Sequence, residues 1–385
     1  MSLKEKIKAG AISLGFVDVG FTSVFPVPGL QRYKQWIEDG QHAGMEYLAS
    51  QRALEARSAP RKLLPSCQTV ISLLSSYPPP GDLQTERMHE IGSDGDLRSD
   101  RVLEIGSGGD LRSDCVLGED TGTINRGDTG TIKSKGRIAA YALLPDYHEV
   151  LKERLERLIV LIKELAGSEV ETYACVDNAP ILEKGYAQKA GLGWIGKNSL
   201  LLHPEFGSWT NLSELLINLE LEPDPPFETD GCGNCQLCVR ACPTQAIMPD
   251  RSIDARRCLS YLTIENRAEI PVELRKAVGN RVFGCDQCQS ICPVNKNAQL
   301  IEQNGVIEEF PNLAESFSLT EEEFRLKYRH IPVWRAKFAG FRRNVAIAMG
   351  NSGQKEFIPL LGDALENECD AVVAEAMRWA IEELV

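Results

Sequence analysis

The chain has 385 residues, and 43% of them are hydrophobic, so it is long enough for two or three domains with apolar cores and is not a disordered protein. Its formal net charge of −13 argues against general affinity for nucleic acid, although a local basic face is compatible with that total. No apolar run approaches the roughly 18 residues that span a bilayer, and the start lacks a signal-peptide pattern. We therefore expect a cytoplasmic protein that does not contact membranes.

The first 80 residues mix helical patterns with one strand, expected over 69–77 and ended by three prolines. A polar, Gly-rich stretch follows, in which residues 90–103 and 104–117 match at 12 of 14 positions. Such a recent tandem duplication predicts an inserted surface loop at about 83–136. Cys115 replaces an arginine of the first copy, so we interpret it as a product of drift and not as a ligand.

Residues 148–166 have the apolar spacing of an amphipathic helix, and a strand is expected over 170–176. Asp177 then lies at the carboxyl end of this strand, where open α/β sheets place functional groups. The alternative is a helix N-cap in the pattern Asp-x-x-Pro. Further on, glycines at 191, 193 and 196 bracket Trp194, which suggests close approach of the backbone to something large and flat. The spacing fits neither a P-loop nor a dinucleotide fingerprint.

Eight of the twelve cysteines form two runs and one isolated position. The first run has the spacing C-x2-C-x2-C-x3-C-P, and in bacterial two-cluster ferredoxins the fourth cysteine of a run ligates the other cluster. This predicts two [4Fe–4S] clusters, one on Cys232, Cys235, Cys238 and Cys292, the other on Cys242, Cys258, Cys285 and Cys288. The alternatives are zinc sites or disulfides. The remaining cysteines, Cys67, Cys175 and Cys369, are interpreted as small buried hydrophobes.

The stretch 222–230 reads as a Pro-rich acidic linker into the cysteine region, and 305–320 as a second linker. Thr320 and Glu323 then form a capping box for a helix. The last 45 residues show three helical patterns whose pairing resembles a HEAT-like repeat. Because so few repeats cannot stand alone, we expect them to dock on the preceding domain.

Several long stretches together resemble epoxyqueuosine reductases, which are cobalamin-dependent iron–sulfur enzymes of queuosine tRNA modification. The matching segments are RSAPRKLLPSCQTVISL (57–73), DYHEVLKERL (146–155), VDNAPILEKGYAQKAGLGWIGKNSLLL (176–202), GSWTNLSELL (207–216), FGCDQCQSICPVNK (283–296) and FRRNVAIAMGNSG (341–353). The chain departs from the family pattern at Ala140-Tyr141, where an Arg-Tyr pair is usual, and at Ser213, where glycine is usual.

The resemblance implies an α/β (α+β) multidomain fold. It would comprise a cobalamin-binding catalytic domain at 1–225, a two-cluster ferredoxin-like domain at 226–304 and a HEAT-like helical domain at 305–385. The implied reaction reduces epoxyqueuosine to queuosine at the tRNA wobble position. A monomeric enzyme would receive single electrons from a flavodoxin or ferredoxin.

The resemblance also implies roles for individual residues. Asp177 matches the family's proton donor, and Lys197 and Arg57 match residues near the cofactor or substrate; a surface lysine and a helix-end cation are the respective alternatives. Ser208 and Ser260 are expected at the cofactor tail or at the seam between clusters and corrin, or else in simple turns. His203 could ligate cobalt, but a hydrogen-bonding histidine is the reading we favour.

The segment 324–343 contains seven Lys or Arg residues and no acid. Interleaved aromatic residues, namely Tyr328, Trp334, Phe338 and Phe341, would suit unstacked bases, and the cations would suit phosphates. The expected tRNA contacts are Arg335, Lys337, Arg342 and Arg343. The alternative is a packed helix with a solvated basic edge.

Two other functions are kept open. A reductive dehalogenase also couples a corrinoid to two clusters, but the twin-arginine signal usual in those enzymes is absent from this sequence. A ferredoxin-type electron carrier would not need about 225 residues before its clusters.

Overall fold

The computed structural model describes residues 1–81, 133–296, 298–299 and 305–385. Most of the insert predicted at 83–136, including Cys115, therefore lies outside the described residues. Among those that are described, no helix combines the length and apolar character needed to cross a membrane.

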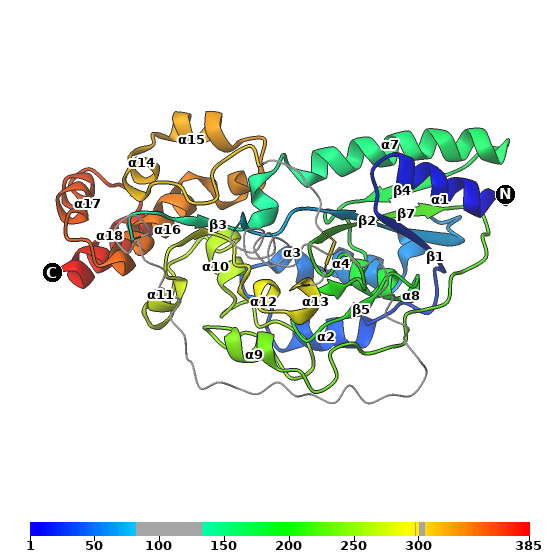
Figure 1. Ribbon diagram of the computed structural model, residues 1–385, viewed down its shortest axis with the longest axis horizontal. Coiled ribbons are helices and arrows are strands. Elements are labelled where there is room, and N and C mark those ends of the chain that lie inside the picture. Colours follow the sequence, from blue (N-terminus) through cyan, green and yellow to red (C-terminus); the bar gives the residue numbers. More distant parts are fainter. Residues whose placement is uncertain (82–132, 297, 300–304) are drawn as a thin grey trace, which may run out of the picture.

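A four-stranded antiparallel sheet forms the centre of the first half of the chain (Figure 1). Its strands, in spatial order, are β1 (Asp18–Ser23), β2 (Thr69–Ser76), β7 (Thr210–Ile217) and β4 (Thr172–Cys175). The two predicted strands are confirmed as β2 and β4. Since every neighbouring pair is antiparallel, the rule for open parallel sheets does not apply, although Asp177 does follow the end of β4.

Helices cover both faces of this sheet. On one face, α1 (Leu3–Ser13) and α7 (Tyr147–Ala166) bury an apolar cluster that includes Leu151 and Leu155, which confirms the predicted amphipathic helix. On the other face, α8 (Glu183–Lys189) packs against β2 and β7. Figure 1 shows α7 and α1 above the sheet and α8 below it.

Shorter elements complete the first half. They are α2 (Leu30–Glu38), α3 (Glu46–Ala49), α4 (Gln51–Ser58), the 3-10 helices η1 (Pro60–Lys62) and η2 (Ala140–Leu143), and the strands β3 (Arg137–Ile138), β5 (Trp194–Ile195) and β6 (Leu201–Leu202). The cysteine region contributes α9 (Leu237–Ala241), α10 (Leu259–Ile264), α11 (Val272–Val278), β8 (Arg281–Phe283), α12 (Gln287–Ser290) and α13 (Pro293–Lys296). Strand β3 pairs in parallel with β8, so the segment that precedes α7 is attached to the cysteine region.

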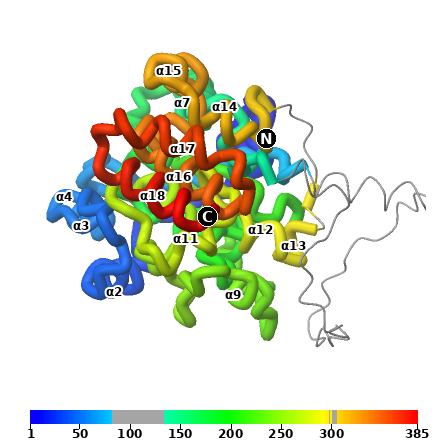
Figure 2. The backbone as a smooth tube through the Cα atoms, turned by 90° about the vertical axis from the view of Figure 1, so that its left-hand side faces the viewer, coloured from blue at the N-terminus to red at the C-terminus, as the bar shows by residue number. Residues whose placement is uncertain are grey.

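The C-terminal part is helical. It consists of α14 (Leu313–Ser318), α15 (Glu321–Tyr328), the 3-10 helix η3 (Pro332–Ala336), α16 (Lys337–Ser352), α17 (Phe357–Leu365) and α18 (Ala371–Leu384). The capping box of Thr320 and Glu323 is confirmed at the start of α15. The linker predicted over 305–320 is wrong in part, because α14 occupies its second half. Figure 2 looks onto this end, where α18 packs against α16 and α17.

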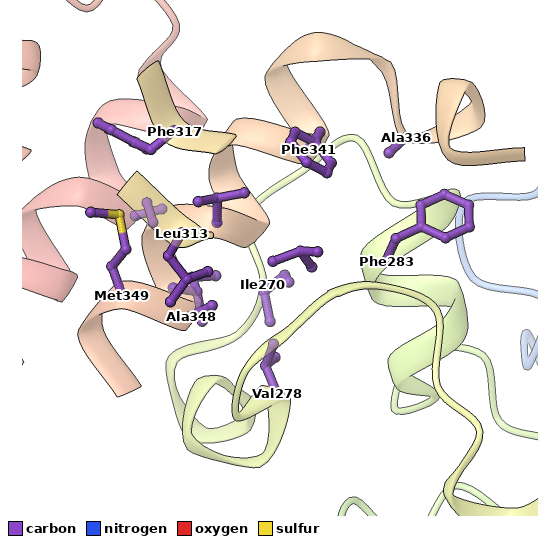
Figure 3. Packing of buried hydrophobic residues seen from close by; sticks show 14 of the residues in the cluster. Ile270, Val278, Phe283, Leu313, Phe317, Ala336, Phe341, Ala348 and Met349 are labelled. Atoms are coloured by element: carbon purple, nitrogen blue, oxygen red, sulfur yellow. The ribbon is translucent and has the colours of Figure 1, made fainter. Parts of the chain in front are cut away.

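One large apolar core joins the C-terminal helices to the cysteine region (Figure 3). Phe341 and Met349 of α16 contribute to it, and so do Val278 and Phe283 of the preceding region. The terminal helices therefore bury their apolar faces against the rest of the chain and have no separate core among the described residues.

Candidate active site

Asp177 follows β4 in a left-handed backbone conformation, with φ of +54°. Aspartate tolerates this conformation better than most residues, and here it turns the carboxylate towards the N-terminus of α7. The Tyr147 hydroxyl donates to Asp177 Oδ2 at 2.8 Å. Arg335 Nη1 lies 3.5 Å and His148 Nε2 3.9 Å from the same oxygen. Asp177 does not cap α8, whose N-cap is Leu182, so the helix-cap alternative is not observed.

Two separate elements bring these partners to Asp177. Tyr147 and His148 begin α7, which is capped by the Asp146 side chain at 3.0 Å from the His148 backbone nitrogen. Arg335 comes from η3, far along the chain, and its guanidinium contacts the His148 ring and lies 5.7 Å from the centre of the Tyr147 ring. Burial, and then the charge of Asp177, raise the pKa of Tyr147, so its phenol stays protonated and acts as a donor.

A second carboxyl group stabilises the turn at Asp177. Glu183, the first residue of α8, accepts a hydrogen bond from the Asp177 backbone N–H through Oε1 at 2.8 Å. Burial raises the pKa of Glu183 to about 8, and the nearby charge of Asp177 contributes, while Lys184 and Arg57 act in the opposite direction.

Two cavities meet at this point, because both are lined by Glu183, Lys184 and Leu200. The larger, of about 380 Å³, is bounded by α2, α4, the start of α8 and the 195–200 and 251–253 loops. The smaller, of about 230 Å³, lies beside Tyr147, Asp177 and the first residues of β7. Acidic and basic side chains thus face a partly apolar space, a setting typical of binding sites for large ligands.

The residues predicted to contact the cofactor lie in different parts of the structure, and only two of those considered next line a cavity. Arg57 lines the larger cavity and lies over the Tyr33 ring at 5.0 Å, and Ser208 lines the smaller one. Ser208 is buried, and its hydroxyl accepts a hydrogen bond from Asn295 Nδ2 at 2.8 Å, so it also ties β7 to the cysteine region.

Lys197 and Ser260 lie at the cysteine region and do not line either cavity. The Lys197 amine donates to the backbone oxygens of Gly233 and Cys235, at 2.7 and 2.8 Å, and so fixes the first cysteine loop. The Ser260 backbone lies beside the Cys258 thiol.

His203 is buried, and both of its ring nitrogens have partners. Nε2 lies 3.2 Å from Asp18 Oδ2, and Nδ1 accepts hydrogen bonds from the backbone nitrogens of Glu205 and Phe206. Both ring nitrogens are thus occupied and His203 lines neither cavity, which agrees with the hydrogen-bonding role that we favoured over cobalt ligation.

The glycines around Trp194 make room for other segments of the same chain. Added side chains at Gly191 and Gly193 would meet the chain's own backbone, at Pro225 and Leu202 respectively. The Trp194 ring stacks on Phe227 at 5.5 Å and packs near Cys292. The loop is therefore glycine-rich because chain segments cross closely beside the first cysteine set.

Within each predicted set of cluster cysteines, thiols affect one another's pKa. Burial raises the pKa of Cys238, and the thiols of Cys292, Cys232 and Cys235 raise it further. Burial also raises the pKa of Cys258 to about 11, with added contributions from Cys285 and Cys242. Apart from the pair Cys238 and Cys288, the thiols that affect one another here are assigned to a common cluster, and a cationic iron–sulfur core would hold such groups as thiolates. Among the described residues, no three His, Cys, Asp or Glu side chains are arranged to hold a single metal ion.

Outside these sets, Cys67 and Cys175 are buried as predicted, whereas Cys369 is exposed, so that prediction is wrong.

The basic segment 324–343 is not a continuous surface. Arg343 is only 1% exposed, and its guanidinium donates to the backbone oxygens of Leu262 and Ala268, both at 2.6 Å. Arg342 pairs with Glu368 at 2.5 Å and lies over the Phe317 ring. The prediction that Arg343 contacts tRNA is therefore wrong, because its guanidinium is buried and serves the carbonyl groups of the core. Arg342 is partly exposed, and its tRNA contact stays a prediction.

The aromatic residues of this segment are also largely internal. Tyr328 and Phe341 are each 1% exposed and pack on Phe324. The prediction that Tyr328 and Phe341 stack on tRNA bases is therefore wrong. Lys337 does lie over the Trp334 ring at 4.7 Å, and Arg335 reaches the Asp177 site.

Sequence reasoning missed Tyr147, Glu183 and Glu214 and gave Arg335 a different role. The first three lie within the matched segments, so the resemblance marked their positions but not their contacts. Nothing in the sequence indicates that residue 335 meets residue 177.

Two family models match parts of the chain. Residues 231–295 match a "4Fe-4S double cluster binding domain", and residues 123–178 match "Epoxyqueuosine reductase QueG, DUF1730". The curated epoxyqueuosine reductase of Pseudomonas aeruginosa is 35% identical over 386 residues, covering 98% of this chain and 94% of the relative. The Escherichia coli enzyme of the same name is 35% identical over 389 residues, covering 98% and 89%. The chain belongs to the epoxyqueuosine reductase family.

Solved structures of this family share the fold. An epoxyqueuosine reductase from Streptococcus thermophilus superposes with a TM-score of 0.81 at 27% identity, covering all of this chain and 91% of that one. An epoxyqueuosine reductase crystallised with an epoxyqueuosine-modified tRNA stem loop gives a TM-score of 0.75 at 24% identity, covering 99% and 98%. Family membership sets aside the dehalogenase and electron-carrier alternatives, and the double-cluster match sets aside zinc and disulfides.

Proposed function

We infer that this chain reduces epoxyqueuosine to queuosine in tRNA. The observation that carries this inference is a carboxylic acid, Asp177, facing a cavity in the same chain as two sets of cluster cysteines, in a member of the epoxyqueuosine reductase family. Removing the epoxide oxygen as water consumes two electrons and two protons. Two one-electron clusters and an acid group match that requirement.

The ligand sets support the electron path. Cys232, Cys235, Cys238 and Cys292 would hold one cluster, and Cys242, Cys258, Cys285 and Cys288 the other. The Cys288 thiol is affected by Cys238 of the other set as well as by its own, so the two sets adjoin. The electrons would come one at a time from an external donor such as a flavodoxin or ferredoxin.

The cavities support cobalamin as the second cofactor. Cobalamin carries a broad ring with amide side chains, and the larger cavity offers an apolar wall with Tyr33, Trp36 and Leu200 beside polar groups such as Arg57 and Asn198. These residues, with Ser208 in the adjoining cavity, would hold it. When bound, cobalamin supplies the reduced cobalt centre for epoxide chemistry.

Asp177 is proposed as the proton donor. It lines the smaller cavity, so its carboxyl group can reach an epoxide oxygen placed there. Tyr147 orients the carboxyl group by donating to Oδ2, and Arg335 is placed to stabilise the charge that remains after the proton has left.

The proposed organisation keeps three regions, 1–225, 226–304 and 305–385, the last one HEAT-like. In the terminal region, Arg335 and Lys337 stay proposed as tRNA contacts, because Arg335 lies beside Asp177 and Lys337 is exposed. The enzyme would act as a cytoplasmic monomer.

The test replaces Asp177 with Asn, which keeps the shape and removes the acid. With epoxyqueuosine-containing tRNA, cobalamin and reductant under anaerobic conditions, turnover should fall roughly 100-fold, the scale of a general acid. Iron content and the cobalamin absorption spectrum should not change. The matched control is Asp363→Asn on the exposed surface of α17. Wild-type turnover in Asp177→Asn would overturn the assignment.

A further inference from the structure

Glu214 is a fully buried carboxyl group in the middle of the sheet. It is 0% exposed and lies in β7 directly opposite Cys175 of β4 and Ser72 of β2. Its neighbour Leu215 in β7 belongs to the apolar cluster under α1 and α7. Because successive side chains of a strand point to opposite faces, Glu214 points to the face that α8 covers. Within the part of the chain that the structure describes, neither carboxyl oxygen has a hydrogen-bond donor.

An ionised carboxylate without donors is very costly in such surroundings. Helix α8, whose first residue is Glu183, packs on β7, and the Glu183 carboxyl is the charged group that acts most strongly on Glu214. Two carboxyl groups can pair only when one of them carries a proton, as in other enzymes where two acids share a site. Burial raises the pKa of Glu214 well above its ordinary value, and Glu183 and Asp177 raise it further.

Among the residues that the structure describes, no lysine or arginine forms an ion pair with either glutamate, although Lys184 and Arg57 are near enough to act on the pKa of Glu183. The Lys184 amine donates to the Ser199 oxygen at 2.7 Å, and the Tyr186 hydroxyl donates to the Val24 oxygen at 2.8 Å. The titratable and charged groups that interact with the pair are Asp177 and Cys175 from the β4 end, Lys184 and Tyr186 from α8, and Arg57 from α4.

The pair also reaches the reaction space. Glu183 lines both cavities, whereas Glu214 lies behind it, away from both. Glu183 and Asp177 line the smaller cavity together and are linked through the Asp177 backbone N–H. A proton held between the two glutamates can therefore enter the cavity through Glu183.

We propose that Glu183 and Glu214 share one proton and that Glu183 delivers it to the substrate as the second proton of the reduction. This rests on the proposed role of Asp177 as the first donor. In the balanced reaction, both C–O bonds of the epoxide break and a C=C bond forms. Two electrons arrive through the clusters, one proton comes from Asp177 and one from the glutamate pair, and the oxygen leaves as water. Solvent then restores both protons.

The first test observes the proton itself. Infrared difference spectra of the holoenzyme between about pH 6 and about pH 9, recorded in H2O and D2O, report the C=O stretch of protonated carboxyl groups. We expect a band that is lost at the higher pH in wild type. Glu183→Gln should lack this band, and in Glu214→Gln the band should be lost at a lower pH than in wild type, while the exposed control Glu382→Gln in α18 should keep the wild-type behaviour. An unchanged band in both pair variants would overturn the proposal.

The second test follows single-turnover rates against pH. The wild-type rate should fall above about pH 8, where Glu183 loses its proton. In Glu214→Gln, Glu183 no longer faces an acid, so its pKa should be lower. The fall in rate at high pH, the alkaline limb of the profile, should then begin about one pH unit or more lower, and the rate at pH 8 should fall by about tenfold. A merely structural role would lower the rate without moving the limb, and that result would overturn the proposal.

The two hypotheses fail in different ways. If Asp177→Asn turns over normally, the proposed first donor is wrong whatever the glutamates do. If Asp177→Asn is impaired but Glu214→Gln has the wild-type infrared band and the wild-type pH dependence of the rate, only the proposal that the glutamates share a proton is wrong. Iron content and cobalamin spectra of each variant show whether it has folded.

Discussion

The buried Arg343 offers a sharp test of how the C-terminal helices are held. Its guanidinium donates to the backbone oxygens of Leu262, Asn266 and Ala268 and to the Asn344 side chain, over distances of 2.6 to 3.1 Å. Replacing Arg343 with Met leaves these three buried carbonyl groups without that donor, at about 1–3 kcal/mol each. The added apolar burial and the removal of a buried charge offset part of this loss. We expect the free energy of unfolding to fall by about 3 kcal/mol.

The assay is urea unfolding of the reconstituted protein under anaerobic conditions, followed by tryptophan fluorescence, since Trp379 lies in the same core. The matched control is Arg329→Met, an exposed arginine after α15, which should change the free energy by less than about 0.5 kcal/mol. The binding of tRNA by folded Arg343→Met, and its salt dependence, should match wild type. A loss of stability below about 1 kcal/mol, or weaker tRNA binding with intact stability, would refute the reasoning.

Three further predictions concern the clusters, the acid site and pH. Cys258→Ala should lose about half of the iron, because it removes a ligand from one cluster only, whereas Cys369→Ala should lose none, as measured by iron analysis after anaerobic reconstitution. Arg335→Met should lower turnover by about tenfold with unchanged iron content, since it removes the cation beside Asp177; wild-type steady-state kinetics would contradict this. The raised pKa of Glu183 means that the folded state holds a proton that the unfolded chain releases, so its contribution to stability is full below the ordinary value of 4.5 and is lost as pH rises to about 8. Urea unfolding across this window should show a fall of up to about 1.4 kcal/mol per pH unit, which Glu183→Gln should flatten.

The elements and cluster ligands that depend on local pattern could be predicted from the sequence. The helix that became α7 has a regular apolar spacing. Thr320 with Glu323 forms the capping box of α15 within four residues. The cysteine sets follow from a spacing rule because each short run delivers three converging thiols. In these cases the deciding interactions are close in sequence or repeat a known arrangement.

The rest depends on contacts between distant segments. Arg343 looks like a surface cation in sequence, but the carbonyl groups that bind it belong to residues 262–268. Glu214 received no role from the sequence, and its burial follows from the position of β7 between β2 and β4 and under α8. Arg335 meets Asp177 only because η3 folds back onto the start of α7. Charge and periodicity alone do not encode such long-range proximity.

The contact between Arg335 and Asp177 has a consequence for inheritance. A recombination event that replaced everything after residue 305 would keep the terminal helices intact but would separate Asp177 from its own Arg335. The first region and the terminal helices would therefore have to be inherited together, or else change in step. A chimaera that joined this chain to a distant relative at that boundary would be expected to assemble both clusters and still turn over slowly, until the matching arginine was restored.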